Sequence, residues 1–389
     1  MRVALIATGV VLVLAIPLYI LLRPAAPYAW NLPEAYPLPP TPTDNPMSEA
    51  KVELGRHLFY DRRLSINGTT SCGTCHRQSL AFTDGLAQAV GATGELHPRS
   101  SMSLVNVAYA ARLNWANHLV DRLEIQALTP LFGEDPVEMG MVGRENEILE
   151  LLRQDAYYSR AVPLAFPGDA DPYSMLNLLR AIASFVRSIV SFDSPYDRYL
   201  HGDASALSPS AVRGMALFFS ERLECFHCHG GVQFTDSSTH ADAVIESVGF
   251  HNNGLYNIAG TGAYPSDNTG LFDITGERRD MGRFKAPTLR NVSVTAPYMH
   301  DGSLETLDAV IRHYEAGGRT ITHGARAGDG SRNPYKSPFI KGFSLVDQER
   351  AELLDFLTAL TDNSVLHEPR LADPFVGDGS ATGAVTQPR

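Results

Sequence analysis

The four cysteines of this sequence fall in two short patterns, and each pattern ends in a histidine. Two thiols separated by two residues can each form a thioether to a vinyl group of haem, and the next histidine can then bind the iron. A thiol redox pair and a zinc site are alternatives, but no further cysteine is left to complete a four-ligand zinc site. The sequence therefore predicts two covalently attached c-type haems, one on Cys72, Cys75 and His76 and one on Cys225, Cys228 and His229.

The sixth ligand of each iron decides what each predicted haem can do. An open position permits peroxide or oxygen chemistry, whereas a filled position suits electron transfer. In the second half of the chain the candidates are Met281, Met299 and Tyr314. Met299 is the usual choice for an electron-transfer cytochrome, and Tyr314 lies on the apolar face of an expected helix, where a core tyrosine is equally compatible with the pattern. The pattern alone leaves this choice open.

The segments around the two motifs are duplicated, which indicates two related modules. Gly-x-x-Leu-Phe precedes each cysteine pair, Phe-Thr-Asp follows each histidine, and residues 103–107 match residues 288–292. Nine residues beyond the asparagine of this last match lie Trp115 in the first copy and His300 in the second. We predict an N-terminal cytochrome c-like domain at 47–205 and a C-terminal one at 206–365, with an extra Gly-rich loop at about 240–284.

Apolar residues recur every three or four positions in the segments 176–189, 307–314 and 353–360, as in buried helices. No run of alternating apolar and polar residues stands out. The sequence therefore predicts an all-α fold, made of two tandem cytochrome c-like haem domains with long loops.

The chain has 389 residues and a formal net charge of −11, which argues against a broad surface for nucleic acid. Residues 3–22 carry no charge and are long enough to span a bilayer, so 1–23 is predicted to be a transmembrane anchor or a cleaved signal. Eight prolines make 24–46 a predicted stiff linker, and 366–389 is a predicted flexible tail. We expect a periplasmic protein, tethered to the inner membrane if the leader is not cleaved.

Three further motifs resemble the bacterial dihaem cytochrome c peroxidase and MauG family over residues 45–365. They are PVEM at 136–139, PTLRN at 287–291 and APYMHDG at 296–302. The resemblance implies that His76 serves a peroxidatic haem and that His229 serves a second, electron-transferring haem. Tyr314 falls where the peroxidases have a methionine ligand and MauG has a tyrosine, which favours Tyr314 as the sixth ligand. Met299 falls where the family often has phenylalanine, which favours a packing role.

The resemblance also implies roles for other residues. Glu138 and Gln126 match the acid/base and polar residues of the peroxidatic pocket, and Trp115 matches a tryptophan between the haems. Thr295 and Pro297 match positions whose carbonyls bind a calcium ion between the haems. The cofactors it implies are two c-type haems and one calcium ion.

The sequence also departs from the family. Ser100 replaces the asparagine that is used for calcium, and His97 lies several residues out of register with the removable distal histidine of the peroxidases. We therefore expect the first haem to have an open position without reductive activation.

The function predicted from these residues is MauG-like. Hydrogen peroxide would form a high-valent dihaem state that oxidises a periplasmic partner protein, at a tryptophan side chain. The stretches 115–119 and 130–140 are most similar to the methanobactin-associated dihaem enzymes of this branch. One alternative is a cytochrome c peroxidase that takes electrons from a small cytochrome, and another is a non-enzymatic dihaem electron carrier or redox sensor.

Overall fold

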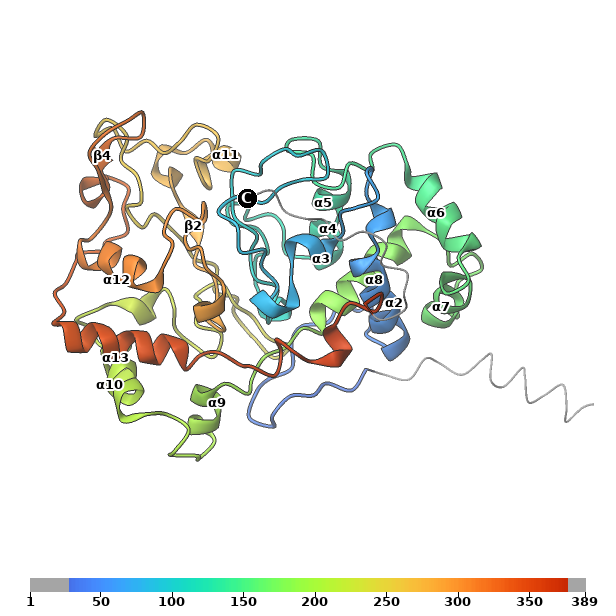
Figure 1. Ribbon diagram of the computed structural model, residues 1–389, viewed down its shortest axis with the longest axis horizontal. Coiled ribbons are helices and arrows are strands. Elements are labelled where there is room, and N and C mark those ends of the chain that lie inside the picture. Colours follow the sequence, from blue (N-terminus) through green and yellow to red (C-terminus); the bar gives the residue numbers. More distant parts are fainter. Residues whose placement is uncertain (1–27, 377–389) are drawn as a thin grey trace, which may run out of the picture.

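The computed structural model describes residues 28–376, and Figure 1 shows its first half beside its second half. The helices of the first half are α2 (Glu49–Tyr60), α3 (Cys72–Cys75), α4 (Leu123–Gln126), α5 (Leu128–Phe132), α6 (Glu145–Gln154), α7 (Tyr158–Ala165) and α8 (Met175–Arg187). Those of the second half are α9 (Pro195–Leu200), α10 (Pro209–Phe218), α11 (Phe272–Thr275), α12 (Leu307–Glu315) and α13 (Asp347–Thr358).

One pair of crossing helices is repeated in the two halves, α2 with α8 and α10 with α13. The helices α2 and α10 start at serine caps, Ser48 and Ser208, whose side chains accept a backbone N–H of the first turn. Glycine lets each pair approach closely. A Cβ on Gly55 would lie 1.9 Å from the carbonyl oxygen of Ala181, and one on Gly214 would lie 1.9 Å from that of Glu352. The duplicated Gly-x-x-Leu-Phe motif is therefore a helix-packing motif.

The prediction of an all-α fold is wrong. Helices make up only 35% of residues 28–376, and two small antiparallel sheets lie in the loops of the second half. β1 (Phe250–His251) pairs with β2 (Phe284–Lys285), and β3 (Thr320–Ile321) pairs with β4 (Gly328–Asp329). Strands of two residues are too short to produce an alternating pattern, so periodicity could not reveal them.

The predicted transmembrane helix also finds no support. Residues 3–22 lie outside the described residues, and within 28–376 no helix is long and apolar enough to cross a membrane.

Two large buried clusters form most of the core of the described residues. The first draws its apolar side chains from residues 52–189 and from 365–371, and the second draws them from 218–360. The chain thus returns at its C-terminal end to the first half. Leu366 and Leu371, which lie in the predicted tail, are buried in the first cluster. The predicted domain bounds stay predictions.

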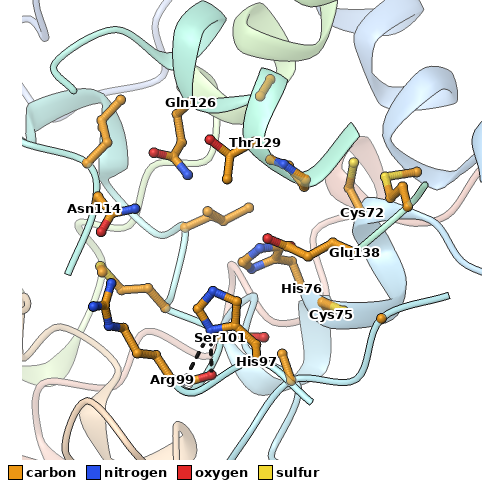
Figure 2. A pocket seen from close by; sticks show the side chains of 18 of the residues that line it. Cys72, Cys75, His76, His97, Arg99, Ser101, Asn114, Gln126, Thr129 and Glu138 are labelled. Atoms are coloured by element: carbon orange, nitrogen blue, oxygen red, sulfur yellow. Dashed lines mark hydrogen bonds between the residues drawn. The ribbon is translucent and has the colours of Figure 1, made fainter. Parts of the chain in front are cut away.

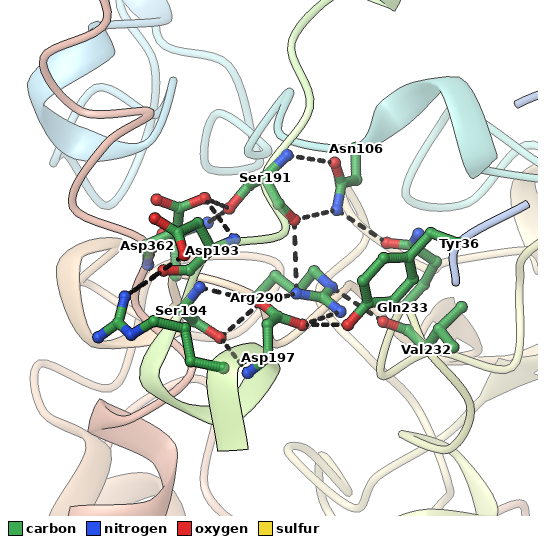
Figure 3. Close-up of polar contacts among 12 residues, drawn as sticks. Tyr36, Asn106, Ser191, Asp193, Ser194, Asp197, Val232, Gln233, Arg290 and Asp362 are labelled. Atoms are coloured by element: carbon green, nitrogen blue, oxygen red, sulfur yellow. Dashed lines mark hydrogen bonds and ion pairs between the residues drawn. The ribbon is translucent and has the colours of Figure 1, made fainter. Parts of the chain in front are cut away.

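The described part of the proline-rich linker packs on the body of the protein. The Tyr36 hydroxyl donates to an Asp197 carboxylate oxygen at 2.6 Å, and the Tyr109 hydroxyl donates to the Pro37 carbonyl at 2.8 Å. Figure 3 shows Tyr36 beside the buried ion pair of Asp197 with Arg290. A buried tyrosine with its hydroxyl paired gains from both apolar contact and hydrogen bonding. These contacts hold the described part of the linker against the protein, whereas an extended spacer would make none of them.

Candidate haem sites

The two histidines that follow the cysteine pairs are held in the same way. His76 Nδ1 lies 2.8 Å from the Phe82 carbonyl oxygen, and His229 Nδ1 lies 3.1 Å from the Phe234 carbonyl oxygen. Both phenylalanines belong to the duplicated Phe-Thr-Asp motif. An Nδ1–H donated to a carbonyl leaves Nε2 free as a metal ligand, which is the arrangement usual for ligating histidines. Burial lowers the pKa of both imidazoles, so each ring is neutral and able to bind iron.

Each thiol pair and its histidine open on a mostly apolar cavity, which is the kind of lining that a haem requires. Cys72 and Cys75 form helix α3, Cys225 begins a short 3-10 helix, and none of the four cysteines is in a disulfide. The cavity at the first pair has about 1350 Å³ of free space and the cavity at the second about 1710 Å³, including space open to solvent. We call them the first and second cavities.

The first cavity brings together the predicted peroxidatic residues. Glu138, Gln126 and Trp115 line it with His76, and Figure 2 shows Glu138 and Gln126 reaching in from different segments. Burial raises the pKa of Glu138 to about 6, so its carboxyl group can exchange a proton near neutral pH. The Gln126 Oε1 atom is buried and has no hydrogen-bond partner among the described residues. Both groups are placed to contact a small ligand in this cavity.

A hairpin at 89–97, which the sequence did not single out, holds the segment that carries Glu138. The Ala92 amide donates to the Glu138 carbonyl at 2.6 Å, and the Val137 amide donates to the Glu95 carboxylate at 2.9 Å. A Cβ on Gly91 would lie 1.9 Å from the Val137 carbonyl oxygen. Only a sequence with glycine at 91 allows this contact without a shift.

His97, at the end of the hairpin, lines the first cavity although it is out of register with the family's distal histidine. Its Nδ1 accepts the backbone N–H of Arg99 at 3.0 Å, as Figure 2 shows. The expectation of an open position at the first haem stays a prediction.

The second cavity contains two of the three candidate sixth ligands. Tyr314, on α12, and Met299 line it together with His229, whereas Met281 is not among its lining residues. Burial raises the pKa of Tyr314 to about 12. The Asn253 amide, another residue that sequence analysis missed, donates to the Met299 sulfur at 3.2 Å. The sulfur of Met299 therefore already has a partner within the protein.

Trp115 lies between the two sites. It lines both cavities and a third, smaller cavity between them, and its indole N–H donates to the Ser100 carbonyl at 3.0 Å. Thr295 and Pro297 line the third cavity as well. A calcium ion at these residues stays a prediction.

Two sites of the same construction, with an indole between them, define a class of protein. Each offers a thiol pair and a neutral imidazole at a mostly apolar cavity, and the first adds a buried carboxyl group that can carry a proton. This is the arrangement of a dihaem c-type oxidoreductase.

Comparison with known proteins identifies the family. The model of the di-haem cytochrome c peroxidase family matches residues 49–205. The methylamine utilization protein MauG of Methylorubrum extorquens is 35% identical over 323 residues, which cover 82% of this chain and 81% of that protein. The cytochrome-c peroxidase IdrP1 of Denitromonas iodatirespirans is 35% identical over 365 residues, 89% of this chain and 91% of IdrP1. The chain belongs to the di-haem cytochrome c peroxidase and MauG family.

A solved structure adds a third relative. The crystal structure of a MauG-like protein associated with microbial copper homeostasis is 49% identical in sequence, covers 89% of this chain and 99% of its own, and superposes with a TM-score of 0.87. Family membership makes this protein a haem peroxidase-type oxidoreductase with two c-type haems. The prediction of two c-type haems is thereby confirmed.

Proposed function

We propose that this protein is a MauG-like enzyme that uses hydrogen peroxide to oxidise a tryptophan side chain of a periplasmic partner protein. The observation that carries the proposal is the buried position of Tyr314 on α12, in the second cavity with His229. A phenolate stabilises an oxidised iron better than a neutral thioether does, because the axial ligand tunes the metal. This favours storing oxidising power over accepting electrons from a small cytochrome.

The first site would handle the protons of peroxide. Glu138, ionised above pH of about 6, can accept a proton from one peroxide oxygen and deliver it to the other, which then leaves as water. The free Gln126 Oε1 can accept a hydrogen bond from the peroxide and orient it. A haem bound in this cavity supplies the iron that exchanges electrons with peroxide.

The second site and Trp115 would connect this chemistry to an outside donor. Trp115 borders both cavities, so its indole offers an aromatic route between them. Because burial raises the pKa of Tyr314 to about 12, its phenol loses its proton at neutral pH only beside a strong positive charge such as a metal ion.

A cytochrome c peroxidase is the second candidate. Met299 also lines the second cavity, and a peroxidase and a MauG protein are equally identical to this chain, each at 35%. In that case a small cytochrome would supply the electrons. The relatives bear the names of enzymes, so the electron-carrier alternative gains no support.

The deciding experiment adds stoichiometric hydrogen peroxide to the purified ferric protein and follows its absorption spectrum at room temperature. For a MauG-like enzyme we expect a spectral change that persists and decays when a partner protein with an accessible tryptophan is added. Mass spectrometry should then show oxygen addition to, or hydrogen loss from, the tryptophan. Rapid, peroxide-dependent oxidation of a reduced small cytochrome, with the tryptophan intact, would instead establish the peroxidase.

A further inference from the structure

Lys285, on strand β2, is a buried cation without a counter-charge. Its side chain is 6% exposed, and its ammonium group donates to the carbonyl oxygen of Arg112 at 2.8 Å. An ammonium has three N–H donors, so two remain. Burial lowers the pKa of Lys285 to about 8, with no neighbouring charge to offset it. Within 28–376, no carboxylate forms an ion pair with Lys285.

His300 is a second buried polar group without a partner. Its Nε2 atom has no hydrogen-bond partner among the described residues, and burial lowers the pKa of the ring to about 4, so the ring is neutral. The ring stacks on Phe284, with centroids 3.5 Å apart and planes inclined by 9°. Phe284 is the strand neighbour of Lys285. Lys285 and His300 both line the second cavity.

The backbone fixes Lys285 in this position. Strand β2 pairs with β1, so that Lys285 faces Phe250 in the ladder, and the Lys285 amide donates to the Trp115 carbonyl at 2.8 Å. Lys285 also lines the third cavity, between the two sites. The backbone of Lys285 is therefore hydrogen-bonded directly to the backbone of Trp115, whose indole lies between the two sites.

Removing an unpaired ammonium from water is strongly unfavourable, so a buried lysine needs an anion. A haem attached through its vinyl groups keeps two free propionate carboxylates, which are the anions that enter the second cavity with it. We propose that Lys285 and His300 bind a propionate of the second haem, which would place a positive charge beside that haem and close to Trp115. This inference depends on the two haems, which family membership establishes, and not on the identity of the electron donor.

The test uses the holoenzyme with both haems. The reduction potentials of the two haems are measured by spectroelectrochemical titration in the wild type and in Lys285→Gln, Lys285→Arg and Lys51→Gln. Lys51 is the matched control, because it is also buried but donates to the Asn45 side chain and the Pro46 carbonyl, away from the cavities. Loss of a nearby positive charge favours the oxidised iron. We expect a lower potential of the second haem in Lys285→Gln only.

Unchanged potentials in a fully loaded Lys285→Gln variant would overturn the proposal. If that variant does not retain both haems, Lys285→Arg and His300→Phe provide a second measurement, since Arg keeps the charge and Phe keeps the stacking ring. Resonance Raman spectra should then show a shifted propionate bending band in each variant relative to the wild type. A propionate band at the wild-type frequency in both of these variants would also overturn the proposal.

Discussion

Asn106 and Asn291, which occupy equivalent positions in the two modules, bind the same residue, Ser191. The Ser191 amide donates to the Asn106 side-chain oxygen at 2.8 Å, and the Asn291 side chain donates to the Ser191 hydroxyl at 3.0 Å (Figure 3 shows the Asn106 contact). Both asparagines have left-handed backbone conformations, with φ of +55° and +61°. Asparagine tolerates this conformation better than most residues. The last element of the duplication is thus a contact between the modules.

This contact predicts a stability effect for Asn291→Ala. The Asn291 side-chain oxygen also accepts the Asp362 amide at 2.8 Å, so alanine leaves the buried Asp362 amide without a partner and removes one of the two hydrogen bonds of the Ser191 hydroxyl. We expect a loss of about 1–3 kcal/mol in the free energy of unfolding, measured by denaturant titration of the holoenzyme. Asn363→Ala, at an exposed position nearby, is the control and should change little. Equal stability of the two variants would show that the contact is dispensable.

The helix crossings predict a matched pair of destabilised variants. Gly55→Ala and Gly214→Ala would each place a methyl group 1.9 Å from a carbonyl oxygen of the facing helix. We expect each to lose about 1–3 kcal/mol, because the helices must move apart. Gly168→Ala, where a Cβ meets no atom within 4 Å, is the control. If thermal unfolding gave the same melting temperature for all three variants, the packing role of Gly55 and Gly214 would be contradicted.

Replacement of Tyr314 tests the sixth ligand of the second haem. If Tyr314 binds the iron, Tyr314→Met should raise the potential of the second haem, because a thioether favours the reduced metal more than a phenolate does. Met299→Leu is the control, since its sulfur is bound to Asn253. Potentials and the ferric absorption spectrum measure the change. A shift in Met299→Leu and none in Tyr314→Met would make Met299 the ligand.

The raised pKa of Glu138 predicts how the reaction with peroxide depends on pH. Its pKa is raised to about 6, so the carboxylate that accepts a proton is lost as the pH falls through 6. We expect the bimolecular rate constant to decrease below pH 6 and to be constant above it. Glu138→Gln should react about 10²–10⁴-fold more slowly and lack this titration. Glu134→Gln, at an exposed position, should keep the wild-type profile. A Glu138→Gln profile identical to the wild type would exclude Glu138 as the base.

Trp115 predicts the efficiency of coupling between the sites. Trp115→Phe keeps an aromatic ring but removes the indole that donates to Ser100. We expect peroxide-driven oxidation of the outside donor to slow by at least about tenfold, a barrier increase of about 1.4 kcal/mol, with both haems retained. Trp30→Phe, at the other tryptophan, controls for the substitution. Stopped-flow traces with wild-type rates in Trp115→Phe would remove Trp115 from the route.

Much of the site could be predicted because its signals are local in sequence. Each cysteine pair and its histidine lie within one helical turn, so their spacing alone specifies attachment and ligation. The duplication gave the equivalence of Asn106 with Asn291, and the family motifs gave Glu138 and Tyr314, which the structure places in the two cavities.

Long-range contacts could not be predicted in this way. The strand pairs β1–β2 and β3–β4 are too short to leave a pattern, and their absence from the sequence signal made the all-α prediction wrong. The docking of Tyr36 on Asp197 joins residues 161 positions apart. The burial of Lys285 and the hydrogen bond from the Val137 amide to the Glu95 carboxylate likewise depend on segments that are distant in sequence and close in space.

The sequence by itself determined the chemistry of this protein, since the spacing of thiols and imidazoles fixes two covalent haem sites within a few residues each. Only the tertiary structure decided how the sites relate. It set Trp115 between the cavities, buried Glu138 so that its pKa rises, and gave Met299 a partner in Asn253. The physical reason is that burial and hydrogen bonding depend on all neighbours in space, whereas motif spacing depends only on neighbours along the chain.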